Sequence, residues 1–357
     1  MIRRSCLVAF STVVVLIVAL GACAPVAPSQ APVAVASRPP AVLDPRTATV
    51  AFYKLENLFD TVDDPQVKDE DFLPGGYKGW DQNRYHTKIQ NLASVIAGLG
   101  SAYGPDVLGA IEMENQQVLR DLAADPQLVD HNYQIVHFDS PDPRGIDCAL
   151  LYKPGRFTVT GQRAVRQPLP DTTMGTRDLL IVNGLLLGEP ITFLVCHWPS
   201  RRGGEKALNR RLTVARQTRQ VIDEQLKTNP GARIVLMGDM NDSPTDSSVL
   251  HILGTSAEML KLPPRKLYNP FYDLQIEGKG TMYYRSRPDV FDMMVLSPGL
   301  LGGSGLRYVP NSAAIHAPVR LTSPQAKFPG EPLGSYVGRK YIGGYSDHFP
   351  VFLTLKK

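Results

Sequence analysis

Four segments of the sequence place acids, amides or a histidine at one end of an apolar run. They are LGAIEMEN (108–115), FLVCHWPS (193–200), IVLMGDMNDS (234–243) and GGYSDHFPVFL (343–353). Each apolar run predicts a buried strand, and the polar residues beside it predict a turn at the edge of a sheet, where ligands are met. We therefore expect folding to bring these strand ends together into one site.

The side chains at these ends are carboxylates, an amide and imidazoles. The main candidates are Glu112, His197, Asp239, Asn241, Asp347 and His348. Asp292 is a further candidate, because it lies inside the apolar run FDMMVL, where an acid is costly to bury unless it is paired. A histidine ring is its natural partner, since a carboxylate fixes the tautomer and raises the basicity.

This set of side chains suits the hydrolysis of a phosphate ester. Hard carboxylates such as Glu112 can hold Mg²⁺ opposite the developing negative charge, and the attacking water needs a base. Arg144, Arg201 and Arg202 lie in glycine-flanked loops, from which a guanidinium can bind a phosphate bidentately. The sequence therefore predicts a phosphate site at the sheet edge.

Each feature taken alone has a plainer interpretation. An Asp-Asn turn is more often only a turn, and a lone histidine more often lies at the edge of a core. The pair Arg201-Arg202 is usually a solvated surface pair, and Asp347-His348 could be the polar start of a strand. Their joint occurrence at strand ends of one chain favours a functional site over these alternatives.

The composition is that of a globular protein. Of 357 residues, 43% are hydrophobic and 20% charged, which is enough for one large domain or two small ones. The formal net charge of +4 is compatible with an anionic substrate but lower than a dedicated nucleic-acid binder usually carries.

The N-terminus has the pattern of an export signal. Arg3 and Arg4 precede an apolar run from Leu7 to Leu20, which is shorter than the ~20 residues of a membrane span. The following Leu-Gly-Ala-Cys resembles a bacterial lipobox, which implies a signal peptide over 1–22 and lipidation of Cys23. An ordinary signal peptide with a chance cysteine is the alternative.

Three segments follow from this interpretation. Residues 1–22 are the signal peptide, 23–47 are the lipidated cysteine with an Ala/Pro-rich tether, and 48–357 are the catalytic domain. Resemblance to bacterial lipoproteins, with Ala24 after the cysteine, implies an outer-membrane anchor and a protein that faces the periplasm or the exterior.

Strand-like and helix-like segments alternate from residue 48 onward. The expected strands are 49–59, 107–111, 133–138, 147–153, 178–188, 191–198, 234–237, 281–284, 291–296 and 349–355. The expected helices are 85–99, 115–124 and 206–225, and 298–334 reads as a long loop. Short strands with hairpins and interspersed helices predict an α/β sandwich. Cys148 and Cys196 are expected to be buried free thiols, with a disulfide between them as the alternative in an oxidising compartment.

Several motifs together resemble one known family. They are FYKLENLFD, LGAIEMEN, RGIDCALLY, CHWPSRRGGE, MGDMNDSPTD, FDMMVLS and GGYSDHFPVFL. Over residues 48–357 their order is similar to that of the endonuclease/exonuclease/phosphatase superfamily, the DNase I-like hydrolases. The longer forms ENLFD, HWPSRRGG and YVGRKYIGGYSDH look like a bacterial secreted subgroup of it.

The resemblance implies a four-layer α/β/β/α sandwich with mixed, mostly antiparallel sheets, and a divalent metal. The metal would be Mg²⁺, or Mn²⁺ or Ca²⁺ in its place. Glu112 matches the metal-binding Glu of the family, Asp347 lies near the metal, and Glu56 lies where some members place a second acid. Arg144 is a weaker match for a phosphate contact.

The resemblance also implies the catalytic roles. Asp239 and Asn241 match the pair that orients the water and contacts the phosphate. His348 matches the catalytic histidine, with Asp292 as its orienting partner, and His197 matches the other histidine at the phosphate.

One residue departs from the family pattern. Lys54 stands where the family usually has an Asn among the metal and phosphate ligands. A lysine there either supplies its own positive charge or binds the phosphate, or else repels the metal.

The sequence therefore predicts a divalent-metal-dependent phosphoester hydrolase, foremost a nuclease or phosphodiesterase that acts on nucleic acid outside the cytoplasm. The alternatives are an enzyme for phospholipid or sugar-phosphate esters, and a non-catalytic lipoprotein that binds a phosphorylated ligand. No protein partner is implied.

Overall fold

The computed structural model describes residues 44–172, 175–324 and 330–357. The predicted signal peptide, Cys23 and all but the last residues of the tether lie outside this part of the chain. In the described residues, no helix is long and apolar enough to cross a membrane.

The first sheet brings together strands that are far apart in the sequence. Its order is β14 (Arg307–Tyr308), β18 (Val351–Lys356), β1 (Thr47–Leu58), β2 (Val107–Met113), β4 (Asp147–Tyr152) and β3 (Gln134–His137), with β15 (Ala314–Ile315) also on β18. Neighbours are antiparallel except β1 and β2, which are parallel. The last strand of the chain thus pairs with the first.

The second sheet is also mixed and mainly antiparallel. Its order is β5 (Phe157–Val165), β6 (Leu179–Leu186), β7 (Glu189–His197), β8 (Ile234–Asp239), β13 (Asp292–Leu296), β10 (Leu267–Tyr268) and β9 (Thr255–Ser256). Only β7–β8 and β9–β10 are parallel pairs. The parallel β7–β8 pair puts two strand ends, His197 and Asp239, side by side.

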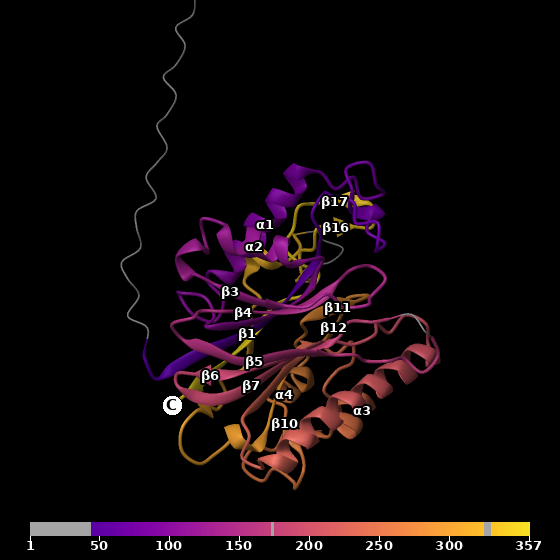
Figure 1. The fold of residues 1–357 in the computed structure, drawn as a ribbon. Helices are drawn as coiled ribbons and strands as arrows, with labels where there is room; N and C mark the ends of the chain where they lie inside the picture. Colours follow the sequence, from indigo (N-terminus) through magenta and orange to yellow (C-terminus); the bar gives the residue numbers. More distant parts are fainter. Residues whose placement is uncertain (1–43, 173–174, 325–329) are drawn as a thin grey trace, which may run out of the picture. The chain divides into compact units, whose positions relative to one another are not determined.

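Alternation along the strands divides the core into two clusters. In β1, Val50 and Phe52 join the cluster that the second sheet also lines, whereas Ala51 and Tyr53 join the cluster beneath helices. The helices on the first sheet are α1 (Gln82–Ile96) and α2 (Gln116–Ala124), and α3 (Glu205–Thr228) covers the second (Figure 1). The predicted four-layer α/β/β/α sandwich is therefore confirmed.

Local signals explain the helix boundaries. The side chain of Asp81 accepts a hydrogen bond from the Arg84 amide, so α1 begins three residues before the predicted start at Tyr85. Asn115 caps α2 in the same way, through the amides of residues 117 and 118. The buried positions of α1 include Ile89, Leu92 and Ile96, which is the predicted apolar face.

Some elements had no clear sequence signal. The strand β5 alternates exposed and half-buried residues at the sheet edge, and its polar face hides the pattern. The expected loop 298–334 is mostly irregular but contributes the two-residue strands β14 and β15. Small hairpins form from β11 (Met282–Tyr284) with β12 (Arg287–Asp289), and from β16 (Tyr336–Val337) with β17 (Lys340–Tyr341). Cys148 and Cys196 are buried free thiols, as predicted.

Candidate active site

Three predicted site residues lie on adjacent strands of the second sheet. His197 ends β7 and pairs with Asp239 at the end of β8, and Asp239 in turn pairs with Asp292 at the start of β13. The register of the sheet alone therefore places an imidazole and two carboxylates in a row. All three residues are buried.

Irregular backbone at the end of β1 and β2 positions Glu112. The register between these strands shifts after the pair Lys54–Ile111, and Glu112 is bulged between β2 and β4 as well. Glu56, Asn57 and Glu112 have φ values of 53°, 51° and 62°, which are unfavourable for residues other than glycine. The bulge lets the Asn57 amide donate to Glu112 Oε2 at 3.2 Å.

The ends of the two sheets meet at His197. Its Nε2 lies 3.8 Å from Glu112 Oε1 of the first sheet and 3.8 Å from Asp239 Oδ2 of the second. Burial, reinforced by the positive charges of Arg177 and Arg144, lowers the pKa of His197 well below its usual value. His197 is therefore neutral at physiological pH, and its ring can accept or donate a hydrogen bond.

Lys54 lies between two of the predicted metal ligands. Its Nζ is 2.6 and 2.7 Å from the two carboxylate oxygens of Asp347 and 3.3 Å from Glu112 Oε2. Burial alone would lower the pKa of Lys54, but Asp347 and Glu112 outweigh it and raise the pKa. The same ion pair lowers the pKa of Asp347, although burial would raise it. A fixed positive charge thus occupies the space between these carboxylates.

His348 and Asp292 form a buried pair. Nδ1 of the histidine is 2.7 Å from Asp292 Oδ2. Burial would lower the pKa of His348, but the Asp292 carboxylate outweighs it and raises the pKa to about 9. Burial also raises the pKa of the nearby Asp239, to about 6. At neutral pH His348 is therefore an imidazolium, and the nearby Asp239 is mostly ionised, with a pKa about one unit below the pH.

Asn241 holds Asp239 in place through the turn after β8. Its amide donates to Asp239 Oδ1 at 2.9 Å, and its side-chain nitrogen donates to the Trp198 carbonyl at 2.9 Å. Two buried polar atoms of the site, His197 Nδ1 and Asp292 Oδ1, have no hydrogen-bond partner among the described residues. Such atoms are what a substrate or water would satisfy.

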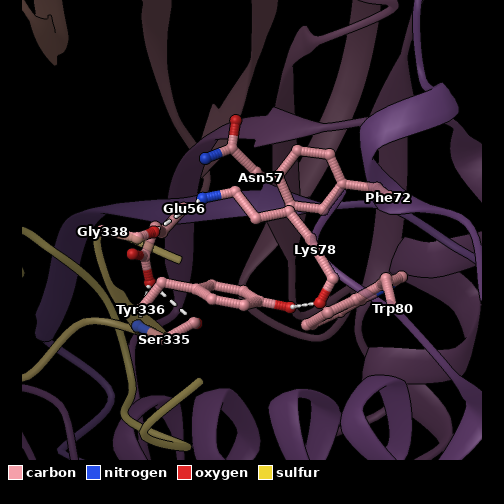
Figure 2. A pocket seen from close by; sticks show the side chains of 8 residues that line it. All are labelled: Glu56, Asn57, Phe72, Lys78, Trp80, Ser335, Tyr336 and Gly338. Atoms are coloured by element: carbon pink, nitrogen blue, oxygen red, sulfur yellow. Dashed lines mark hydrogen bonds between the residues drawn. The ribbon is translucent and has the colours of Figure 1, made fainter. Parts of the chain in front are cut away.

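Glu56, also predicted as a metal ligand, is bound by a lysine and a serine. Its Oε2 accepts from Lys88 Nζ at 3.0 Å and from the amide and hydroxyl of Ser335, both at 2.8 Å. Figure 2 shows it at one side of a small pocket, with the ring of Tyr336 between the Glu56 side and Trp80. The structure therefore gives Glu56 a role in joining β1 to the C-terminal loop.

The three predicted phosphate-binding arginines lie in two environments. Arg201 makes ion pairs with Asp242 and Asp246, at 3.2 and 2.5 Å, and stacks on Phe291. Arg144 and Arg202 instead line a common cavity. The fold thus separates the adjacent arginines 201 and 202.

The sequence comparison decides the family. Residues 49–357 match the endonuclease/exonuclease/phosphatase family. The chain belongs to this family. Its name groups nucleases and phosphatases, so the chain is classed broadly with phosphoester hydrolases. No curated protein matches the sequence.

Solved structures share the fold at low sequence identity. TDP2 from D. rerio, complexed with a single-strand DNA product, has 16% identity and a TM-score of 0.53, covering 87% of this chain and 99% of that chain. A mannosyl-6-phosphatase from Bacteroides thetaiotaomicron has 16% identity and a TM-score of 0.52, covering 87% and 100%. The human Nocturnin catalytic domain with a bound sulfate has 16% identity and a TM-score of 0.50, covering 88% and 95%.

Endonuclease/exonuclease/phosphatase enzymes typically use divalent metals, and this chain has groups that could hold one. In the described part of the chain, ligand atoms of Asp239, Asp292 and His348 lie within 4.8 Å of one another. The predicted ligands Glu112 and Asp347 supply hard oxygens nearby, but Lys54 already binds both. The donor set fits a cation, with Lys54 competing for two of its oxygens.

The sequence analysis did not single out two buried charged residues near the site, Lys88 and Arg177. Lys88 is on the apolar face of α1, where the pattern predicts a core residue, and its ammonium contacts Glu56. Arg177 lies two residues before β6 and is buried, with its guanidinium donating to the Trp198 carbonyl. Lys88 is a charge within an apolar helix face, which is the one clue that the sequence offers, whereas Arg177 stands next to Asp178 and offers none.

Proposed function

We propose that the protein is a phosphoester hydrolase that cleaves phosphodiesters, foremost those of nucleic acid. The observation that carries the proposal is the meeting of Asp239, the His348–Asp292 pair, neutral His197 and cationic Lys54 at the ends of both sheets. A merely structural cluster has no need of a buried imidazolium beside a carboxylate whose pKa is about 6.

The proposed roles follow from the protonation states. Asp239 orients the attacking water and accepts its proton, because its pKa of about 6 leaves it ionised yet basic near neutrality. The His348 imidazolium, held by Asp292, stabilises negative charge on the phosphoryl oxygens or donates a proton to the leaving group. Neutral His197 is placed to bind another oxygen, and the buried charge of Lys54 attracts the anion without a direct bond.

Dependence on a divalent metal, Mg²⁺ foremost or Mn²⁺ or Ca²⁺, is part of the proposal. Glu112 and Asp347 would hold the ion, which when bound supplies further positive charge opposite the phosphoryl oxygens. Because Lys54 binds both of these carboxylates, we expect the affinity for the ion to be weak.

The substrate class and location are also proposed. Among the structural neighbours, one is complexed with a DNA product and another is titled a mannosyl-6-phosphatase, so nucleic acid leads and sugar phosphates or phospholipids come next. The signal-like N-terminus and Cys23 support an exported protein of a bacterial lipoprotein subgroup, anchored to the outer membrane and facing the periplasm or exterior.

Hydrolysis assays test the proposal. Purified protein with Mg²⁺ or Mn²⁺ should cleave bis(p-nitrophenyl) phosphate and at least one of plasmid DNA, single-stranded DNA or RNA. Asp239→Asn should lower kcat by roughly a hundredfold or more, the range usual for loss of a general base. Excess EDTA should lower the rate, and added Mg²⁺ should restore it. Equal activity in the wild type and Asp239→Asn would refute the assignment.

A non-catalytic phosphate-binding protein is the second candidate, favoured by one observation. Lys54 offsets part of the negative charge of Asp347 and Glu112 without a metal, which lessens the need for an ion when an anion binds. Calorimetric titration separates the two: binding of inorganic phosphate with neither divalent-ion binding nor hydrolysis would select the binding protein.

A further inference from the structure

We propose that a cavity beside the catalytic residues binds a second phosphate group of the substrate, separate from the phosphate that reacts. The inference rests on the proposed hydrolase function and narrows its substrate class. It favours oligonucleotides or nucleotides with more than one phosphate over compounds with a single phosphodiester.

The cavity lies next to the catalytic centre. Its volume is about 370 Å³, within the ~300–1,000 Å³ range of ligand sites, and it is formed by segments 142–144, 175–177 and 199–210 among others. One carbonyl connects it to the centre: Trp198 O accepts from Arg177 Nη2 at 2.8 Å and from the Asn241 side chain at 2.9 Å. Two residues that line the cavity, Arg177 and Arg144, are also close enough to His197 for their charges to lower its pKa.

The cavity concentrates positive charge. Five cationic residues line it against a single acid, Asp142; they are Lys68, Arg144, Arg177, Arg202 and Arg210. The net charge of the whole chain is only +4, so this excess is local. It makes the cavity a site for an anion.

Internal ion pairs do not use up this charge. Arg177 and Arg144 both bind Asp142, at 2.9 and 3.2 Å, and Arg210 is held by Asp171 outside the cavity. The side chains of Lys68 and Arg202 are exposed and form no hydrogen bond or ion pair with any described residue. These two exposed cations are therefore free to bind an anionic ligand.

Two residues that line the cavity carry buried polar atoms without a partner among the described residues. Arg177 is 6% exposed, and Asp142 and the Trp198 carbonyl fix its guanidinium, yet its buried Nε has no partner among the described residues. The Thr176 hydroxyl beside it is also buried and without a partner there. Leaving such donors unpaired costs free energy, which a ligand oxygen would recover.

A phosphate matches this arrangement better than other anions. The lining residues offer the guanidinium of Arg177, the hydroxyl of Thr176 and the exposed cations of Lys68 and Arg202. A phosphate can use all of them, because its oxygens accept hydrogen bonds from several directions. A carboxylate presents only two oxygens in one plane. Because the neighbouring centre acts on a phosphoester, the simplest ligand is another phosphate of the same substrate.

Paired substrates test the proposal. Thymidine 5′-(p-nitrophenyl phosphate) is compared with its 3′-phosphorylated form, and the ratio of kcat/KM for the second over the first is measured. The double variant Lys68→Gln/Arg202→Gln should lower this ratio by roughly tenfold, since a bond to a charged group contributes about that factor. The control Arg163→Gln/Lys261→Gln removes the same two charge types from exposed positions outside the cavity and should leave the ratio unchanged.

Calorimetry with inorganic phosphate separates this proposal from the proposed function. The Lys68→Gln/Arg202→Gln variant should bind phosphate roughly tenfold more weakly than the wild type and the control variant. An unchanged affinity and an unchanged substrate ratio would overturn the cavity assignment while leaving the hydrolase intact. If neither substrate is cleaved, the hydrolase fails, and weaker phosphate binding by the variant still supports the anion site.

Discussion

Lys54 is the residue that departs from the pattern expected of the family. The resemblance predicts metal ligands at Glu112 and Asp347, and the structure places the Lys54 ammonium 3.3 and 2.6 Å from their oxygens. Replacing the ammonium or a carboxylate of such a buried ion pair destabilises a protein, because a buried charge is left without its partner. Lys54 is therefore both a structural tie between the acids and a rival of any metal ion.

Replacing Lys54 should strengthen metal binding. In Lys54→Asn the two carboxylates lose the ammonium that binds both, so a divalent cation no longer competes with it for their oxygens. We expect the Kd for Mn²⁺, measured by calorimetry, to fall by roughly tenfold or more, in line with 1–3 pKa units for a close opposite charge. We also expect Mn²⁺ to raise the Tm of the variant more than that of the wild type.

The control for this measurement is Lys261→Asn, which removes an exposed lysine that lines no described cavity. It should bind Mn²⁺ as the wild type does. Equal Mn²⁺ affinity in all three proteins would show that Glu112 and Asp347 do not hold the ion.

At the scale of elements, α1 fixes the loop that carries the last two site residues. Lys88 donates to Glu56 Oε2 at 3.0 Å, Ser335 Oγ at 2.9 Å and the Tyr345 carbonyl at 2.6 Å. One turn later, Asn91 donates to the carbonyls of Gly343 and Gly344, both at 3.0 Å. These contacts join α1, the end of β1 and the loop just before Asp347 and His348.

Removing the Lys88 charge should destabilise the protein strongly. Lys88→Met keeps the apolar stem but leaves the Glu56 carboxylate, 11% exposed, without its cation. We expect the free energy of unfolding, from urea titration, to fall by about 3–5 kcal/mol, as for a broken buried ion pair. Lys88→Met/Glu56→Gln should recover part of this loss, because the unpaired charge is gone.

Gln90→Met is the matched control, because Gln90 is an exposed residue of the same helix. Its effect should stay within about 0.5 kcal/mol. A similar loss in Gln90→Met and Lys88→Met would mean that helix propensity, and not the Lys88–Glu56 pair, sets the stability.

At the scale of the molecule, the sequence predicted where the strands end better than it predicted which strands are neighbours in the sheet. Apolar runs located β7, β8 and β13, and sheet register then had to bring His197, Asp239 and Asp292 together. Period-2 patterns show which residues are buried, but they do not say which strands pair. The shared site was predictable only because all its members lie at the polar ends of such runs.

The missed features depend on contacts between distant segments. The edge strand β5 is largely polar, so its alternation carries little apolar signal. Glu56 turns toward Lys88 because a bulge with positive φ redirects it, and sequence patterns do not show such a bulge. Similarly, Arg177 meets Asp142 only through tertiary packing over 35 positions of sequence.

The pH dependence of the reaction is a property of the whole assembled site. Asp239 must be ionised to act as a base, so kcat/KM should rise as pH increases through about 6. His348 must be protonated, so kcat/KM should fall as pH increases through about 9. Lys54, Asp347 and Asp292 surround these groups, and Lys54 stays charged throughout because its pKa is raised. A pH–rate profile on bis(p-nitrophenyl) phosphate should therefore be flat between these limits.

Asp292→Asn tests the assignment of the alkaline limb. Without the carboxylate, the burial that lowers the pKa of His348 is no longer outweighed, so the limb should move down by about 1–3 pH units. The control Asp130→Asn removes an exposed acid that does not contribute to the shift of the His348 pKa, and it should not move the limb. In Asp292→Asn the new side-chain amide can still hold the His348 ring. A fall in rate alone therefore does not identify the group that titrates at the alkaline limb. An alkaline limb that stays near pH 9 in Asp292→Asn would show that a group other than His348 is titrating.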